Sequence, residues 1–127
     1  MKLSVFKKIV HQIVRDANGE VIDVFAPGPT PNFFAANVSL QAHGSFAVLC
    51  SLEGNWAFSR PYDEGVCELS FVDCEPLASA LRDAYEIDPI SESALNQAFK
   101  KQSFHEDSDI RYWKPKSLGE GLFNWWD

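Results

Sequence analysis

Apolar residues near the start of the chain recur in pairs every four positions. The pairs are Val5-Phe6, Ile9-Val10 and Ile13-Val14. Side chains at this spacing lie on one face of a helix, away from the charged residues between them. A strand is the alternative for residues 9–15, because isoleucine and valine are mediocre helix formers and Asn18-Gly19 is a hairpin sequence. We favour a helix that ends at Asn18-Gly19 in left-handed backbone.

Short apolar runs separated by turn residues follow this helix. They predict strands at residues 20–26, 37–41, 45–51, 55–60 and 66–72. The PGPTP segment, residues 27–31, interrupts the series because its three prolines exclude regular structure. His43-Gly44 and Glu53-Gly54 supply tight turns between later strands. Connections this short favour an antiparallel meander.

After Cys74 the apolar spacing changes to that of helices. One helix is predicted from Pro76 to the residues before Asp88-Pro89. A second is expected after Ser91 as its N-cap, with residues 100 and 101, both lysines, in its last turn, where the helix dipole favours cations.

A short helix is also predicted near the end of the chain. Residues 117–120, with the sequence SLGE, match the capping box, in which the serine and glutamate side chains satisfy backbone N–H groups of the first turn. On this helix Leu118, Leu122 and Trp125 share one face. We expect that face to cover the core.

Strands that precede helices are typical of an α+β domain. We therefore predict a single domain over residues 1–127, with one layer of antiparallel sheet made of four to five strands. The N-terminal helix and two to three C-terminal helices are expected to pack on one face of that sheet. A chain of this length buries roughly two thirds of its unfolded surface, so it needs no disulfide or metal to fold.

The sequence favours a cytosolic location. No stretch approaches the roughly 18 apolar residues of a membrane-spanning helix, and the first residues lack the apolar core of a signal peptide. Cys50, Cys67 and Cys74 cannot all pair within the chain. We expect reduced thiols and no association with a membrane.

Charge is distributed unevenly along the chain, whose net charge is −7. Residues 16–99 contain 13 acids against only Arg60 and Arg82. Such a surface repels phosphate backbones, so nucleic-acid binding is disfavoured, whereas a basic protein partner is complementary. The candidate contact residues are Asp63, Glu64 and Glu68. The simpler interpretation is that these acids keep a small domain soluble.

Aromatic side chains gather after the PGPTP segment and at the C-terminus. A stripe of rings at helical spacing usually faces the core, so a lid on the core is the first interpretation. Rings at the edge of this stripe, beside basic residues, are typical of interfaces and suggest a homodimer surface. Together the rings also predict a pocket for a small molecule. The candidate residues are Phe33, Phe34, Trp56, Tyr62, Tyr112, Trp113, Phe123 and Trp126.

The motifs of known catalytic and metal sites are not found in the sequence. There is no CxxC, HxxxH or GxSxG pattern and no glycine-rich phosphate loop. Residues 105–109, HEDSD, are expected to form a solvated turn between a helix and a strand rather than a cation site. A glycosidase-like pair among the acids of residues 63–75 stays open. We expect no cofactor, no metal and no catalytic residue, and favour a protein that is not an enzyme.

Two segments, CSLEGNWAFSRP at residues 50–61 and RYWKPKSLGEGLFNWWD at residues 111–127, resemble parts of small uncharacterised bacterial proteins carried on integron gene cassettes and other mobile elements. The resemblance covers about a quarter of the chain. It implies a bacterial accessory protein, among which immunity proteins and other binding modules are expected.

The leading hypothesis is therefore a binding module of immunity or antitoxin type whose acidic surface engages a basic protein. The alternative is a small-molecule-binding protein or enzyme with an aromatic-lined pocket.

Overall fold

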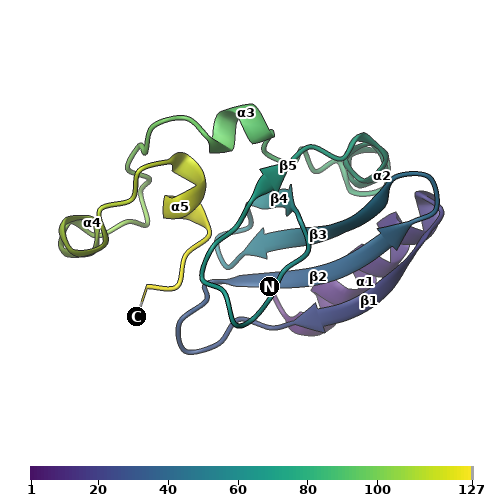
Figure 1. Ribbon diagram of the computed structural model, residues 1–127, viewed down its shortest axis with the longest axis horizontal. Coiled ribbons are helices and arrows are strands. Elements are labelled where there is room, and N and C mark those ends of the chain that lie inside the picture. Colours follow the sequence, from purple (N-terminus) through teal and green to yellow (C-terminus); the bar gives the residue numbers. More distant parts are fainter. Residues whose placement is uncertain (127) are drawn as a thin grey trace.

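An open antiparallel meander forms the centre of the computed structural model, which describes residues 1–126 (Figure 1). Its strands follow one another in chain order: β1 (Gly19–Phe25), β2 (Phe33–Leu40), β3 (Gly44–Ser51), β4 (Trp56–Ser59) and β5 (Phe71–Val72). The helices are α1 (Leu3–Asp16), α2 (Glu75–Tyr85), α3 (Glu92–Leu95), α4 (Asp107–Trp113) and α5 (Leu118–Leu122). The predicted α+β class and antiparallel sheet are confirmed. Within residues 1–126 no helix is both long and apolar enough to cross a membrane.

The N-terminal segment is the helix α1, not a strand. Its apolar stripe is buried from Phe6 to Val14, although Val5 stays 44% exposed. The backbone of Asn18 has φ 57°, the left-handed conformation predicted for the end of this helix. The turn leads directly into β1, so α1 folds back against β1 and β2.

The two faces of the sheet are covered by different parts of the chain. Alternate residues of β2 point to opposite sides, so Phe34 and Val38 belong to one core cluster while Phe33 and Ala35 belong to another. Packing of all helices on one face, as predicted, is therefore wrong. The reason is that β2 begins with four buried residues in succession and β4 is buried throughout, so both faces require a cover.

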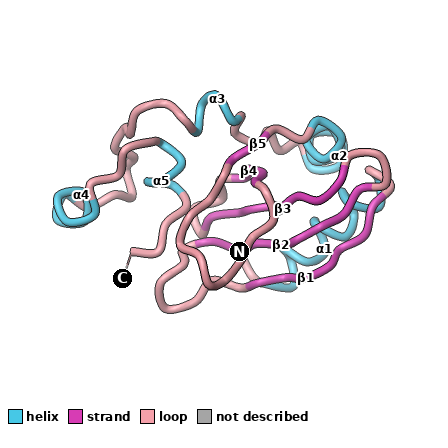
Figure 2. The backbone as a smooth tube through the Cα atoms, viewed as in Figure 1, coloured by secondary structure: helices cyan, strands magenta, loops and turns pink. Residues whose placement is uncertain are grey.

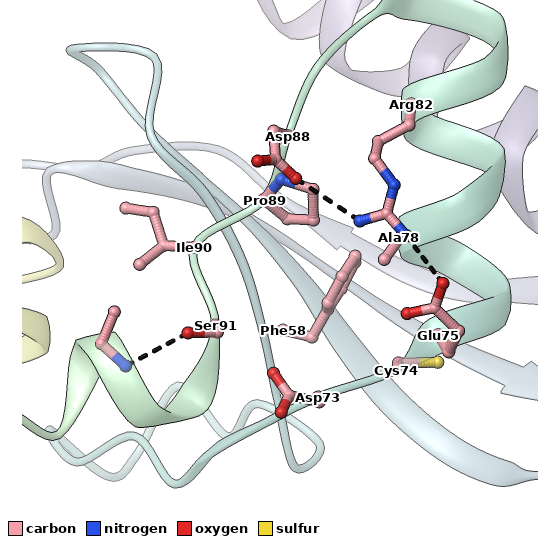
Figure 3. Close-up of a pocket in the computed structure, with 11 residues that line it drawn as sticks. Phe58, Asp73, Cys74, Glu75, Ala78, Arg82, Asp88, Pro89, Ile90 and Ser91 are labelled. Carbon is pink, nitrogen blue, oxygen red and sulfur yellow. Dashed lines mark hydrogen bonds and ion pairs between the residues drawn. The ribbon is translucent and has the colours of Figure 1, made fainter.

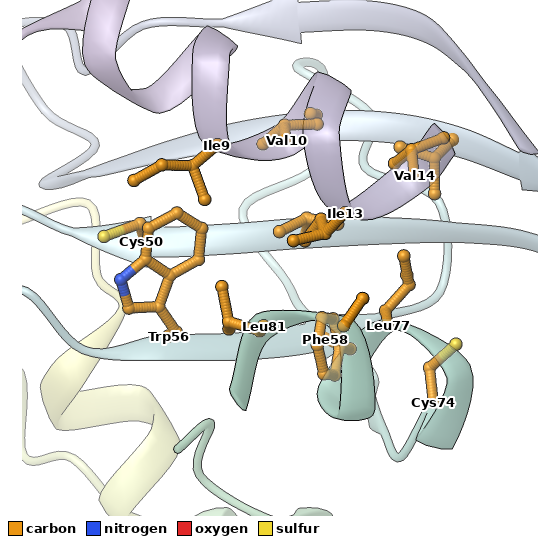
Figure 4. Packing of buried hydrophobic residues seen from close by; sticks show 14 of the residues in the cluster. Ile9, Val10, Ile13, Val14, Cys50, Trp56, Phe58, Cys74, Leu77 and Leu81 are labelled. Atoms are coloured by element: carbon orange, nitrogen blue, oxygen red, sulfur yellow. The ribbon is translucent and has the colours of Figure 1, made fainter. Parts of the chain in front are cut away.

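The first face is covered by α1 and α2. Figure 4 shows Ile9 and Ile13 of α1 above Trp56 and Phe58 of the sheet, with Leu81 of α2 beside them. Rings extend this core, because Phe6 stacks on Phe34 with ring centroids 5.1 Å apart and on Trp56 at 5.7 Å. Most of the residues that α1 and α2 bury on this face are those that the helical spacing of apolar residues predicted.

The second face is covered by loops and by α3 and α5. Residues 60–70, which connect β4 to β5 and which we name the acidic loop, cross the front of the sheet (Figure 1). The capping box predicted at Ser117 and Glu120 is present at the start of α5. Beyond α5, Phe123 is buried against Phe33 and Phe71. The C-terminal segment thus has the core-covering role expected of it.

Several predicted elements differ from the structure. β2 begins at Phe33 rather than at residue 37, because Phe33 and Phe34 also pair with β3. α5 ends at Leu122, where the backbone becomes extended at Phe123, so Trp125 lies beyond the helix predicted to carry it.

The strand expected at residues 66–72 is reduced to β5, because residues 63–68 are exposed and have no neighbouring strand to pair with. The helix after Ser91 stops at Leu95, and Ala98 forms a bridge to Ser117. Lys100 and Lys101 therefore lie outside it. Residues 107–113, partly assigned to a turn, form α4 within a region that is otherwise mostly loop (Figure 2).

Candidate functional site

A side chain of β2 holds the acidic loop against the sheet. Asn37 of β2 accepts a hydrogen bond from the backbone N–H of Tyr62 at 2.7 Å and donates one to the Tyr62 carbonyl at 2.9 Å. Asp63 follows immediately and accepts a bond from the N–H of Gly65 at 2.9 Å. This arrangement places the three predicted acids, Asp63, Glu64 and Glu68, at the exposed surface of the loop.

Tyr62 anchors the same loop from below. Its ring lies edge-on to Phe25 and Phe33, with centroids 5.1 and 5.7 Å away. Burial is the main reason that the pKa of the Tyr62 phenol is raised; a hydrogen bond with Trp125 opposes the shift, and the charges of the nearby acids add to it. The phenol therefore stays neutral at neutral pH.

The exposed part of the aromatic end is built from two chain segments. Trp113, the last residue of α4, is parallel to Trp126, with planes 1° apart and ring centroids separated by 6.4 Å. Tyr112 is 76% exposed and lies edge-on to Trp113 at 4.9 Å. Trp113 itself is 37% exposed. Tyr112 and Trp113 are therefore surface residues, although large aromatic side chains are commonly buried in the core.

A pocket of about 220 Å³, which we name the tryptophan pocket, opens between these segments. Its walls come from α4, α5, the residues after α5 and the acidic loop. They include Trp113, Glu120, Phe123, Trp125, Trp126 and Cys67. Glu120 is the single charged side chain among the described residues that line it.

A second hollow of about 300 Å³ adjoins the tryptophan pocket. The two share Cys67, Glu120, Phe123 and Trp125, and the second adds Glu68 of the acidic loop. Acidic side chains and tryptophan rings therefore form one continuous surface. In the part of the chain that the structure describes, no lysine or arginine lines either hollow.

His105 connects the segment before α4 to α5 and to Trp126, which lines the tryptophan pocket. Its Nδ1 accepts a hydrogen bond from the N–H of Gln102 at 2.9 Å, and its Nε2 donates to the carbonyl of Gly121 at 2.7 Å. These two bonds require the neutral imidazole with its proton on Nε2. The ring also contacts Trp126, with centroids 5.8 Å apart. His105 is buried, whereas the sequence predicted a solvated turn here.

Asp107, two residues further on, pairs with Lys101 at 2.6 Å. The hydrogen bond and the charge of Lys101 lower the pKa of this carboxyl group below its ordinary value. The pair connects the start of α4 to the preceding loop. It is exposed, so it contributes little to stability by itself.

The structure separates the aromatic residues that the sequence grouped into one pocket. Phe34 and Trp56 are buried with Phe6 beneath α1, whereas Phe33 and Phe123 are buried on the opposite face of the sheet. The first three predicted rings, at positions 33, 34 and 56, are thus core residues. By contrast, Tyr112, Trp113 and Trp126 lie together at the surface.

Sequence reasoning missed Cys67, Glu120 and Trp125 as members of the site. Glu120 was recognised only as a helix cap and Trp125 only as a core-facing residue. Trp125 does contact Phe33, with ring centroids 5.1 Å apart, but it also lines both hollows. The proximity of Cys67 to the C-terminal segment had no signal in the sequence.

A larger hollow of about 540 Å³ lies between α2 and the segment that leads to α3 (Figure 3). Arg82 crosses it, 2.7 Å from Glu75 and 3.4 Å from Asp88. Asp73 accepts a hydrogen bond from the N–H of Glu92 at 2.9 Å. Its charged side chains are therefore already engaged with one another or with the backbone, whereas Glu64 and Glu68 of the acidic loop have no such partner among residues 1–126.

The three cysteines are free thiols in different surroundings. Burial raises the pKa of Cys50 to about 12 and also raises the pKa of Cys74. Cys67 is exposed in the acidic loop. Within residues 1–126 no group of three or more His, Cys, Asp or Glu side chains is placed to hold a metal ion.

Comparison with known proteins does not indicate a function for this chain. No protein-family model matches this chain, and neither a curated protein sequence nor a solved structure matches it significantly.

Proposed function

We propose that this protein is a non-enzymatic binding module that engages a basic protein partner through the acidic loop and the tryptophan pocket. The observation that carries the proposal is the shared wall between them. Glu68 lines the hollow that adjoins the tryptophan pocket, and Cys67 and Trp125 line both. Unpaired acids and partly exposed tryptophans on one continuous surface are suited to recognising cationic side chains.

The acids of this surface are available for an external partner. All three salt bridges seen among residues 1–126 lie elsewhere, on Arg82 and Lys101. Asp63, Glu64 and Glu68 take part in none of them. Exposed charges of one sign accelerate the encounter with an oppositely charged protein, and they do so most strongly at low salt.

The tryptophans are expected to supply most of the binding affinity, which surface charge alone does not provide. Charged groups at the rim of an interface mainly affect the association rate, whereas buried aromatic side chains provide most of the affinity. Trp113 is 37% exposed and would become buried on binding. The acidic loop would therefore guide the partner, and the tryptophan pocket would retain it.

An immunity or antitoxin protein of a bacterial cytosol is the role that fits this division of labour. If the partner is a toxin nuclease, the acids occupy the lysines and arginines that otherwise hold phosphate groups. The free thiols are compatible with a reducing compartment.

The test is affinity capture from a lysate of the source organism, at low and then moderate salt. The wild-type protein is compared with a triple variant, Asp63→Lys, Glu64→Lys and Glu68→Lys. A matched control reverses three acids that lie outside the acidic loop and line neither hollow of the proposed surface: Asp16, Glu20 and Asp83. Both variants change the net charge equally, so only the position of the charge differs.

We expect a basic protein that is retained by the wild type and by the control variant, released as salt rises, and lost from the acidic-loop variant. Equal loss with both variants would show a response to net charge alone. Equal retention by all three proteins would overturn the proposed role of the acidic loop.

A further inference from the structure

The tryptophan pocket combines indole rings with one carboxylate in its lining. Resting on the proposed function, we propose that it receives the guanidinium group of a single arginine of the partner. Trp113 and Trp126 present parallel faces, and Trp125 and Phe123 line the same pocket. Cations are attracted to the faces of aromatic rings, most strongly to tryptophan.

The shape of the pocket favours arginine over lysine. A guanidinium is planar and stacks on aromatic faces, whereas an ammonium is a compact point charge with a tightly held hydration shell. A flat group can stack on one face of an indole ring, whereas the gap between the two parallel indoles, with centroids 6.4 Å apart, is narrower than two stacking contacts require. Trp113 is 37% exposed, so a ligand can reach this residue from solvent.

The charge of the pocket also favours a cation. Glu120 is the charged group in its lining, and Glu68 lines the adjoining hollow. Lys114 and Lys116 flank Pro115, which lines the pocket, but neither lysine is part of the lining. An arginine that stacks on an indole face in this pocket therefore meets carboxylates, and no lysine or arginine among the described residues lines the pocket or the adjoining hollow.

The carboxylate of Glu120 is held in position before any ligand binds. Its Oε2 accepts a hydrogen bond from the backbone N–H of Ser117 at 3.1 Å, as part of the capping box, and a further one from the N–H of Lys116 at 3.2 Å. Within residues 1–126 its other oxygen, Oε1, has no hydrogen-bond partner. A fixed carboxylate with one free oxygen is a ready acceptor for a guanidinium N–H.

The opposite wall is similarly supported. The N–H of Trp126 donates to Asn124 at 3.2 Å, and Asn124 donates in turn to the carbonyl of Gly121 at 3.0 Å. Gly121 also accepts from His105. A pocket whose walls are already ordered loses little conformational entropy on binding.

The experiment follows the indole N–H resonances of the full chain during titration with Nα-acetyl-arginine amide. Nα-acetyl-citrulline amide, which has the same shape but no charge, is the matched ligand. We expect saturable shifts of the Trp113 and Trp126 resonances with arginine at millimolar concentration, and at least about fivefold weaker binding of citrulline. Equal binding of the two ligands, or no saturable shift with arginine, would overturn the proposal.

Two variants localise the binding. Glu120→Gln removes the charge but keeps a side chain that satisfies the capping box, so folding should be retained while arginine binding weakens several-fold. Trp113→Leu removes one of the two indoles, so the arginine ligand should no longer shift the indole N–H resonance of Trp126. Unchanged arginine binding in Glu120→Gln, with unchanged thermal unfolding, would contradict the assignment.

A second copy of this chain is the rival occupant. Indole resonances that change with protein concentration in the absence of ligand, together with a dimer in light scattering, would overturn the arginine assignment. The proposed function is tested separately by the acidic-loop variants. Partner capture that depends on the acidic loop, with no arginine binding, would leave that function standing and remove this inference.

Discussion

Asn32 and Asn124 exchange two hydrogen bonds across 92 positions of the chain. The N–H of Asn124 donates to the Asn32 side chain at 2.8 Å, and the N–H of Asn32 donates to the Asn124 carbonyl at 3.0 Å. The Asn32 amide also donates to the carbonyl of Leu122 at 3.0 Å. Asn32, which lies between the PGPTP segment and β2, thus attaches the C-terminal segment to the start of the sheet.

Replacing Asn32 by alanine should loosen this attachment. The variant leaves the N–H of Asn124 and the carbonyl of Leu122 without their partner, which we expect to lower the free energy of unfolding by about 1–3 kcal/mol. Denaturant unfolding followed by tryptophan fluorescence measures the change. Asn96→Ala, at an exposed position, is the control and should stay within about 0.5 kcal/mol of the wild type. Similar stabilities for both variants would contradict the fastening role.

Replacing Asn37 by alanine should release the acidic loop while preserving the sheet. The Tyr62 N–H and carbonyl lose their side-chain partner, so amide hydrogen exchange should accelerate at Tyr62 and at Gly65. Amides of β3 that pair with β2 serve as the internal reference. If exchange accelerates equally in β3, the effect is global and the specific role of Asn37 is not supported.

Thiol reactivity should distinguish the three cysteines. Cys67 is exposed, whereas burial raises the pKa of Cys50 to about 12 and raises that of Cys74, so neither buried thiol forms a thiolate at neutral pH. We expect one thiol to react with a disulfide reagent in the native protein and the other two only on unfolding. In Cys67→Ser the fast reaction should disappear. A remaining fast phase in this variant would show that a second thiol is accessible.

The ion pair of Asp107 and Lys101 should make the start of α4 sensitive to acid. Because the folded pKa of Asp107 lies below its ordinary value of 3.8, the pair stabilises the folded state at pH values above that value. This contribution is lost as the pH falls through the lowered pKa. The carboxyl resonance of Asp107 reports the titration, and Lys101→Met should return the pKa toward its ordinary value. An unchanged pKa in that variant would exclude Lys101 as the cause.

Much of the candidate site was visible in the sequence only as separate parts. The acids at positions 63, 64 and 68 were recognised from charge, and the rings at positions 112, 113 and 126 from their concentration at the C-terminus. Their connection was not predictable, because Cys67 and Trp125 meet only after the acidic loop crosses the sheet and the C-terminal segment folds over it. Neither of these arrangements produces a recognisable pattern among residues that are close together in the sequence.

The sequence by itself determined the elements that depend on neighbouring residues. The apolar pairs of α1, the left-handed Asn18 and the capping box of Ser117 and Glu120 all involve side chains a few positions apart. Periodicity and capping express such short-range interactions directly.

Only the tertiary structure decided which face of the sheet each segment covers, and therefore which tryptophans are buried. Trp56 and Trp113 have the same side chain, yet the first is 3% exposed beneath α1 and the second 37% exposed at the tryptophan pocket. The physical reason is that burial depends on contacts between segments distant along the chain. Such contacts follow from the packing of the whole chain, not from its local pattern.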